Sequence, residues 1–165
     1  MEEILPTILL VEDQPNDVLL LQRALQKAKV PNPVQVVGDG EDAIAYFSGT
    51  GPFADRKVHP FPRFVIMDVK MPKVSGLEVL EWLRAHPEYQ VIPTLMLSSF
   101  AMDNDIIAAY KLGANSYIRK NSDPHEMARM IRKMYEYWMM CLRPKPGSGP
   151  IKPDGEWSGR HQLPR

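Results

Sequence analysis

Three carboxylates, Glu12, Asp13 and Asp68, stand where short apolar segments of this sequence end. If the fold brings them together, they repel one another and raise one another's pKa unless a cation offsets their charge. Mg²⁺ takes oxygen ligands and commonly binds through one or two carboxylates plus a phosphoryl oxygen. A carboxylate can also act as a nucleophile and form an aspartyl phosphate. These residue types therefore predict an Mg²⁺ site that supports phosphoryl transfer.

Two further polar residues, Ser98 and Lys120, follow later apolar segments and suit the same chemistry. Phosphoryl transfer depends mainly on aligning the groups and on neutralising charge on the transferred oxygens. The Lys120 ammonium can do this as a point charge on the side away from the cation. Ser98 can donate a hydrogen bond to the phosphoryl group.

Strands and helices must alternate along the chain to position these residues. Apolar runs predict five strands, at residues 7–11, 33–37, 64–67, 94–97 and 115–119. Helical spacing and capping residues predict helices that begin near Pro15, after Gly38-Asp39-Gly40, at Ser75, near Asp103 and at Asp123-Pro124. The segment 49–63 contains Pro52, Pro60 and Pro62, and we expect a loop there with no regular element.

Five strands that alternate with five helices predict the α/β class, a doubly wound, five-stranded parallel sheet with helices on both faces. In such sheets ligands bind beyond the carboxyl ends of the strands. The polar residues that end four of the predicted strands should therefore meet at one edge of the sheet.

Length and composition fit one domain with a tail. Of the 165 residues, we expect 1–142 to fold and 143–165, rich in Pro, Gly and charge, to be a mobile tail. Lys plus Arg and Asp plus Glu each number 20, so no net field favours nucleic acid or anionic lipid. The apolar runs are too short to cross a membrane, and the acidic start is unlike a signal peptide, so we expect a cytoplasmic protein. Cys141 is the single cysteine, which excludes an intrachain disulfide.

Four motifs together resemble the receiver domains of bacterial two-component response regulators. In chain order they are Leu10-Val11-Glu12-Asp13, residues 67–76 (MDVKMPKVSG), Leu97-Ser98-Ser99 and Tyr117-Ile118-Arg119-Lys120. Each motif alone is weak, but their order and spacing are specific, and the match runs from about residue 7 to residue 142. The resemblance implies a flavodoxin-like strand order, 2-1-3-4-5.

The resemblance also implies a role for each residue. Asp68 is the expected phosphoacceptor, and Lys120 the expected phosphate-contacting lysine. Ser98 and Tyr117 are the expected switch hydroxyl and switch aromatic. The backbone carbonyl of Lys70 is expected to join the acidic pair and Asp68 as a ligand of Mg²⁺.

The long loop 49–63 and the extended last helix look like small stand-alone regulators that partner phytochrome-type histidine kinases. A sensor histidine kinase of that type is therefore the expected partner, and an independent enzyme activity is not expected. One residue departs from the family pattern, because Asn121 follows Lys120 where the family usually has proline, often after a cis bond. A cis bond before a non-proline residue costs about 2.5 to 4 kcal/mol, so a trans bond is favoured here. This leaves the position of Lys120 open.

Simpler interpretations exist for the same residues. Glu12-Asp13 alone would fit a helix start, where acidic groups favour the helix dipole. Asp68 could be a turn residue, Ser98 a small strand-end group, Lys120 a solvated lysine and Tyr117 a half-buried aromatic. An Asp after the third strand and a Lys after the fifth shift the balance toward a shared site.

Two other functions remain open. A phosphatase of the haloacid dehalogenase type also uses an aspartyl phosphate and Mg²⁺, but it places a second Asp two residues after the nucleophile, where this chain has Lys70. A pseudo-receiver would bind partners without being phosphorylated, and Asn121 is the feature that keeps this alternative open. A DNA-binding role is disfavoured, because the chain shows no helix-turn-helix pattern.

The last helix predicts a surface at which phosphorylation is read. Its stripe of Met130, Met134, Trp138 and Cys141 extends beyond what a sheet of short strands needs to cover. Exposed apolar surface usually marks a partner site. We therefore expect a homodimer through the last helix and the fifth strand, with Trp138 as its main anchor.

Overall fold

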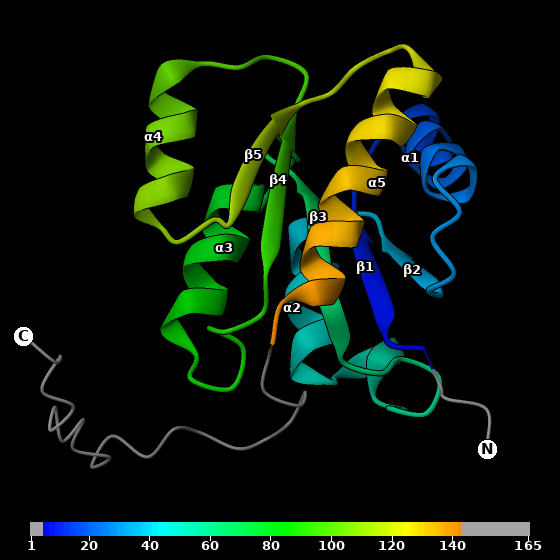
Figure 1. Ribbon diagram of the computed structural model, residues 1–165. Helices are drawn as coiled ribbons and strands as arrows, with labels where there is room; N and C mark the ends of the chain where they lie inside the picture. Colours follow the sequence, from blue (N-terminus) through cyan, green and yellow to red (C-terminus); the bar gives the residue numbers. More distant parts are fainter. Residues whose placement is uncertain (1–4, 143–165) are drawn as a thin grey trace, which may run out of the picture.

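The computed structural model describes residues 5–142, in which strands and helices alternate (Figure 1). The elements are β1 (Thr7–Val11), α1 (Pro15–Lys27), β2 (Val34–Val37), α2 (Gly40–Ser48), the 3₁₀ helix η1 (Gly51–Phe53), β3 (Pro62–Asp68), α3 (Gly76–Ala85), β4 (Thr94–Ser98), α4 (Asp103–Lys111), β5 (Ser116–Arg119) and α5 (Pro124–Met140). The tail expected at 143–165 lies outside the described residues.

The five strands form one parallel sheet in the order β2-β1-β3-β4-β5. The predicted fold class and strand order are therefore confirmed. The order reverses beside β1, since β2 lies on one side of that strand and β3 on the other. A crevice at such a switch point is where this class of sheet binds ligands.

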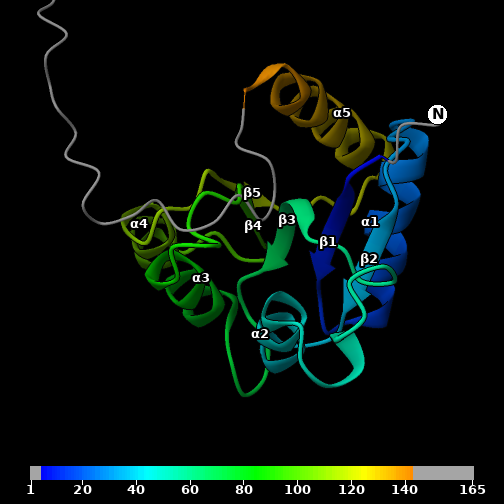
Figure 2. The same cartoon turned by 90° about the horizontal axis from the view of Figure 1, so that it is seen from below.

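Two apolar layers cover the two faces of the sheet. Helices α1 and α5 bury Leu21, Leu25 and Ile131 against one face. Helices α2, α3 and α4 cover the other face, where Phe47 and Leu80 are fully buried. Figure 2 shows α2 and α5 on opposite sides of the sheet. Burial on both faces explains why the central strands read as continuous apolar runs.

The expectation of a loop without regular elements at 49–63 was wrong. A short 3₁₀ helix forms at Gly51–Phe53, and β3 begins at Pro62 rather than at Phe64. Proline is tolerated as the first residue of a strand because no ladder donor is needed there. The strand is consequently two residues longer at its start than the sequence indicated.

The expectation that Trp138 is an exposed partner anchor was also wrong. Its side chain is only 4% exposed and meets Phe64 of β3 edge to face, with ring centroids 5.0 Å apart. Met130 and Met134 pack partly buried on the same core layer. The apolar stripe of α5 thus faces its own sheet, and Cys141, at the end of the helix, is partly exposed.

Among residues 5–142, no helix has both the length and the apolar character that crossing a membrane requires.

Candidate phosphoacceptor and cation site

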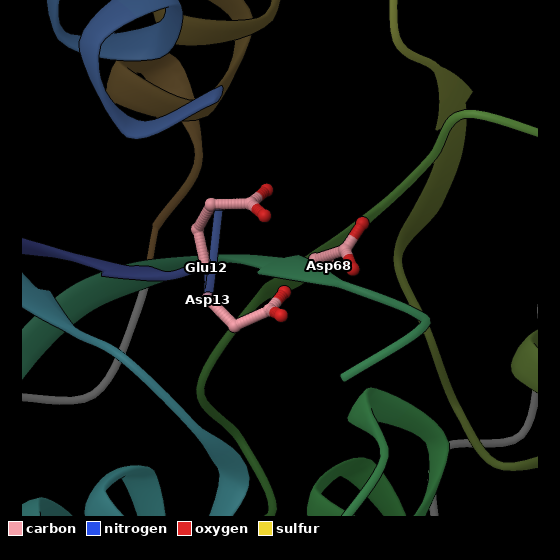
Figure 3. Close-up of side chains that lie close together, drawn as sticks. All are labelled: Glu12, Asp13 and Asp68. Atoms are coloured by element: carbon pink, nitrogen blue, oxygen red, sulfur yellow. The ribbon is translucent and has the colours of Figure 1, made fainter. Parts of the chain in front are cut away.

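The carboxyl ends of β1 and β3 bring the three predicted carboxylates together. Oxygen atoms of Glu12, Asp13 and Asp68 all lie within 4.8 Å of one another. The side chains of Glu12 and Asp13 point toward Asp68 (Figure 3). Val11 pairs with Met67 across the two strands, so Glu12, which follows β1, and Asp68, the last residue of β3, are held at the same level of the sheet.

Lys120 joins this cluster from the end of β5. Its Nζ lies 2.8 Å from Asp68 Oδ1 and 2.7 Å from Glu12 Oε2. The backbone fixes this position, because the Lys120 amide donates to the Ser98 carbonyl at 2.8 Å and extends the ladder between β4 and β5. The Lys120 side chain is only 9% exposed, so it is not a solvated surface lysine.

Asp17 is a fourth acidic residue at the site, and the sequence analysis missed it. Its Oδ2 accepts a hydrogen bond from Lys120 Nζ at 2.7 Å. Asp17 lies in the first turn of α1, four residues after Asp13, and Pro15 begins that helix. The one available signal was an acidic residue in a first helical turn, which is common for reasons of helix dipole alone.

Burial changes the proton affinities of these groups. Desolvation raises the pKa of Glu12 and of Asp68, against the lowering effect of Lys120. Burial alone would lower the pKa of Lys120, but its hydrogen bonds to Asp17, Asp68 and Glu12 outweigh that effect and raise it. The lysine therefore stays charged, and it only partly offsets the carboxylates around it.

The oxygen atoms present fit a divalent cation. Asp13 Oδ1 is buried and has no hydrogen-bond partner among the described residues, whereas Asp13 Oδ2 accepts from Gln14 Nε2 at 2.8 Å. An unpaired buried carboxylate oxygen is costly unless a cation or water satisfies it. Glu12, Asp13 and Asp68 are the residues that would hold the ion, and hard oxygen ligands of this kind suit Mg²⁺ or Mn²⁺.

The loop after β3 wraps around the Asp68 carboxylate. The backbone amide of Lys70 donates to Asp68 Oδ2 at 3.1 Å, which orients the side chain. The Lys70 side chain points away to Asp105 of α4, at 3.4 Å. A role for the Lys70 carbonyl as a cation ligand stays a prediction.

Gly76 lets α3 approach Asp68 closely. A Cβ atom at Gly76 would lie 2.0 Å from the carbonyl oxygen of Asp68, far inside any real contact distance. The Gly76 amide also donates to the Val69 carbonyl at 3.0 Å. The glycine at the end of the motif 67–76 is thus required by the packing of α3 on the end of β3.

Ser98 ends β4 next to this loop. It is 2% exposed, and its hydroxyl both donates to the carbonyl of Phe100 at 2.6 Å and accepts from the Phe100 amide at 3.2 Å. The neighbouring residue Leu97 pairs with Asp68 in the sheet. Ser98 is therefore held at the site by its own loop, and its contact with a phosphoryl group stays a prediction.

Tyr117 lies on the edge strand β5 and packs on the layer formed by α2, α3 and α4. Its hydroxyl is buried without a hydrogen-bond partner among the described residues. The next residue, Ile118, faces the α1 and α5 layer instead. Successive side chains of a strand point to opposite faces, so the Tyr117 ring lies on the face away from the α5 layer. The role of Tyr117 as the switch aromatic stays a prediction.

Asn121 does not displace Lys120. No cis peptide bond occurs in the part of the chain that the structure describes, so the bond between Lys120 and Asn121 is trans. The Asn121 side chain accepts from the Asp123 amide at 2.9 Å and turns the chain into α5. The position of Lys120, which the sequence left open, is within ion-pair distance of Asp68 all the same.

The fold and the site together define a flavodoxin-like domain with an acidic pocket and a lysine at the carboxyl edge of its sheet. The sequence matches the family model of the response regulator receiver domain over residues 8–132. The chain belongs to this family, whose members act in two-component signalling. The simpler interpretations of Glu12, Asp13, Asp68 and Lys120 as unrelated residues are not compatible with their shared site.

Several relatives are regulators connected with phytochromes or red light. The chain is 29% identical to response regulator Rcp1 of a Synechocystis species over 132 residues, which cover 80% of this chain and 88% of Rcp1. The structure is similar to that of the phosphorylated cyanobacterial phytochrome response regulator RcpA, with a TM-score of 0.75, 32% identity and coverage of 84% of this chain and 97% of RcpA. It is also similar to a response regulator in red light signalling of R. palustris, with a TM-score of 0.79, 31% identity and coverage of 84% and 97%. The predicted resemblance to regulators of the phytochrome type is confirmed.

Receiver domains bind a divalent metal at an acidic pocket, and the cluster of Glu12, Asp13 and Asp68 fits that description. Rcp1 has been crystallised in a Mn²⁺-bound form, whose structure matches this chain with a TM-score of 0.72, 28% identity and coverage of 84% and 97%. Receiver domains are generally not independent enzymes.

Proposed function

We propose that the protein accepts a phosphoryl group from a histidine kinase on Asp68, with Mg²⁺ as the cation, and that this changes the surface it offers to partners. The observation that carries the proposal is the position of Asp68 between two acidic residues and an ammonium group. Lys120 Nζ lies 2.8 Å from Asp68 Oδ1, and the carboxylates of Glu12 and Asp13 complete the cluster.

The step follows from these positions. An Asp68 carboxylate oxygen attacks phosphorus, an O–P bond forms, and the P–N bond of a phosphohistidine donor breaks with its electron pair remaining on the imidazole. Lys120 neutralises charge on the transferred oxygens, and Ser98 would donate a hydrogen bond to them in place of the one it donates to the Phe100 carbonyl. The bound cation supplies further neutralisation of the same oxygens.

A histidine kinase of the phytochrome type is the partner we propose, because Rcp1, RcpA and the R. palustris protein are the kind of regulator that this chain resembles. A cytoplasmic location and the absence of nucleic-acid binding stay predictions from the sequence.

Incubation with acetyl phosphate and Mg²⁺, followed by intact mass, tests the phosphoacceptor. The wild type should gain one phosphoryl group, and Asp68→Asn should gain none. If Asp68→Asn retains the full gain, the phosphoryl group is on another residue. If the wild type gains nothing while it still binds Mg²⁺, the alternative of a phosphorylation-independent binding module is favoured.

We also propose that the response is read by a homodimer through α5 and β5. A groove of about 460 Å³ lies between these elements and is lined by Ser116, Ile118, Met134 and Tyr137, among others. The Tyr137 side chain is 60% exposed, and β5 is an edge strand. A second copy of the chain is the occupant that the sequence analysis predicts for this face.

The α4 side carries a second set of exposed apolar residues that the sequence analysis did not predict. They are Phe100, Met102, Ile107 and Tyr110. Tyr117 packs on this side of the sheet, and its backbone amide donates to the Tyr110 hydroxyl at 3.3 Å. A change at Ser98 that moves Tyr117 would therefore first alter the surface at α4.

A further inference from the structure

The Lys120 ammonium has three N–H donors, and three carboxylates surround it. Its Nζ lies 2.7 Å from Asp17 Oδ2, 2.7 Å from Glu12 Oε2 and 2.8 Å from Asp68 Oδ1. The ammonium group of a lysine sits on a flexible four-carbon chain, and contacts of this kind fix its position. The orientation of the ammonium thus depends on which of the three carboxylates remain available to it during the reaction.

Asp17 differs from Glu12 and Asp68, the other two carboxylates on Lys120, because it has no second role at the site. Glu12 and Asp68 belong to the cluster that would hold the cation, and Asp68 also receives the phosphoryl group. The cluster does not include Asp17, whose side chain is 30% exposed and comes from a helix rather than from a strand end. Asp17 is therefore the one carboxylate on Lys120 that serves neither the cation nor the phosphoryl group.

The start of α1 places Asp17 firmly. Gln14 donates its backbone amide to Glu12 Oε1 at 3.2 Å, and the Asp17 amide donates to the Gln14 carbonyl at 3.0 Å. Pro15 fixes the first turn of the helix between them. This turn carries Asp17 back over the strand ends from which Glu12 extends.

We propose that Asp17 is a positioning residue for phosphoryl transfer, which holds Lys120 from the α1 side so that one of its donors faces Asp68. The inference rests on the proposed phosphorylation of Asp68. When the O–P bond has formed, the donor that served Asp68 Oδ1 can serve a phosphoryl oxygen, while Asp17 keeps the ammonium in place. A group oriented before the reaction lowers the entropic part of the barrier.

The kinetic test compares Asp17→Ala with Asp17→Asn. At saturating acetyl phosphate and Mg²⁺, Asp17→Ala should be phosphorylated about tenfold more slowly, the effect of losing one charge-assisted hydrogen bond. Asp17→Asn keeps an acceptor oxygen of about half the strength, so its rate should stay within about threefold of the wild type. The affinity for acetyl phosphate and the affinity for Mg²⁺ should change much less than this rate in Asp17→Ala.

Asp42→Ala is the matched control. Asp42 is the third residue of α2, as Asp17 is the third residue of α1, and it is exposed. Its removal tests whether the loss of any acidic residue in a first helical turn slows the reaction, and we expect the wild-type rate. Thermal unfolding by circular dichroism checks that all three variants are folded.

A spectroscopic measurement reads the Lys120 ammonium directly. In ¹⁵N-labelled protein without a phosphodonor, the Nζ protons held by three carboxylates should exchange slowly with water and give a resolved signal. That signal should weaken in Asp17→Ala and persist in Asp17→Asn and in Asp42→Ala.

Each outcome separates the two proposals. Slow phosphorylation of Asp17→Ala with recovery in Asp17→Asn supports the positioning role. A phosphorylated wild type with an equally fast Asp17→Ala overturns the positioning role alone, and so does an Asp17→Asn as slow as Asp17→Ala, because helix charge would then be the cause. A wild type that takes no phosphoryl group overturns the proposed function and the positioning role together.

Discussion

Four acidic residues and one lysine leave the carboxyl edge of the sheet with an excess of negative charge. Two like unit charges 4 Å apart repel each other by about 4 kcal/mol at the effective dielectric near a protein surface. An exposed ion pair stabilises a protein by only about 0 to 1 kcal/mol, so one such pair does not offset this repulsion. Oxygens of Glu12, Asp13 and Asp68 lie within 4.8 Å of one another, and Lys120 contacts only two of these residues. The site is therefore destabilised in the absence of a cation.

Asp13→Asn should stabilise the protein in the absence of Mg²⁺ and should reduce the stabilisation that Mg²⁺ provides. Without the cation, the variant removes repulsion and should raise the free energy of unfolding by about 1 kcal/mol. With saturating Mg²⁺, the wild type should gain more stability than the variant, because the charged Asp13 carboxylate, whose Oδ1 is buried without a hydrogen-bond partner among the described residues, is a stronger ligand than an amide. Urea unfolding at neutral pH, with EDTA or with Mg²⁺, measures both values.

Asp42→Asn serves as the control for Asp13→Asn, since Asp42 is exposed in the first turn of α2. Its dependence on Mg²⁺ should equal that of the wild type. If Asp13→Asn also keeps the full stabilisation by Mg²⁺, the cation binds elsewhere.

The residues at strand ends could be predicted from the sequence, whereas Asp17 could not. The positions at the ends of apolar strands, Glu12, Asp13, Asp68 and Lys120, come together because a parallel sheet brings its strand ends to one edge. The contact of Asp17 with Lys120 depends on the angle at which α1 leaves β1, which a turn of a few residues sets and sequence spacing does not specify. The position of Lys120, which the sequence left open, is set by the ladder of β4 and β5, because this ladder fixes the Lys120 backbone whatever residue follows it.

At the level of elements, the junction of β3 and α3 is the most constrained part of the site. Gly76→Ala would place a Cβ atom 2.0 Å from the Asp68 carbonyl oxygen. Either α3 or the end of β3 must move, so we expect a loss of about 1 to 3 kcal/mol in the free energy of unfolding, or more. Phosphorylation of the variant should slow as well, because the Asp68 side chain shifts with its backbone.

Gly38→Ala is the matched control for Gly76→Ala. A Cβ atom at Gly38 would meet no atom within 4 Å, so stability and phosphorylation should stay close to those of the wild type. Urea unfolding and the rate of phosphorylation by acetyl phosphate compare the two variants. Equal stability of Gly76→Ala and wild type would show that the close approach of α3 to Asp68 is not required.

The segment before β3 shows where element prediction failed. Pro60 and Pro62 indicated a loop, yet Pro62 pairs with Thr7 as the first residue of β3. The preceding turn is held by Arg56, which donates to the backbone carbonyls of Tyr46 and Phe47 at the end of α2. Such side-chain contacts across a loop have no periodicity, so the sequence pattern does not reveal them.

At the scale of the whole molecule, the packing of α5 on the sheet explains why Trp138 is buried. Phe64, which already lies within the strand that the sequence predicts, meets the indole ring edge to face. Short strands suggested that the end of the last helix extends past the sheet, and Trp138 was for that reason expected to contact a partner. The helical stripe was identified correctly, but periodicity alone does not say whether a stripe covers the protein's own sheet or another molecule.

Tyr137 and Trp138 should therefore behave oppositely when each is changed to alanine. Trp138→Ala should lower the free energy of unfolding by about 3 to 5 kcal/mol, because it empties a buried aromatic site. Tyr137→Ala, at a residue 60% exposed, should change stability by no more than about 0.5 kcal/mol.

If a homodimer forms through α5 and β5, Tyr137→Ala should shift it toward monomer while Asp68 still accepts the phosphoryl group, since the Tyr137 side chain lines the groove between these elements. Analytical ultracentrifugation of the wild type and of Tyr137→Ala, each with and without acetyl phosphate and Mg²⁺, measures the shift. A wild type that stays monomeric in both states at tens of micromolar would reject the homodimer, and the groove between α5 and β5 would then have to bind a different partner.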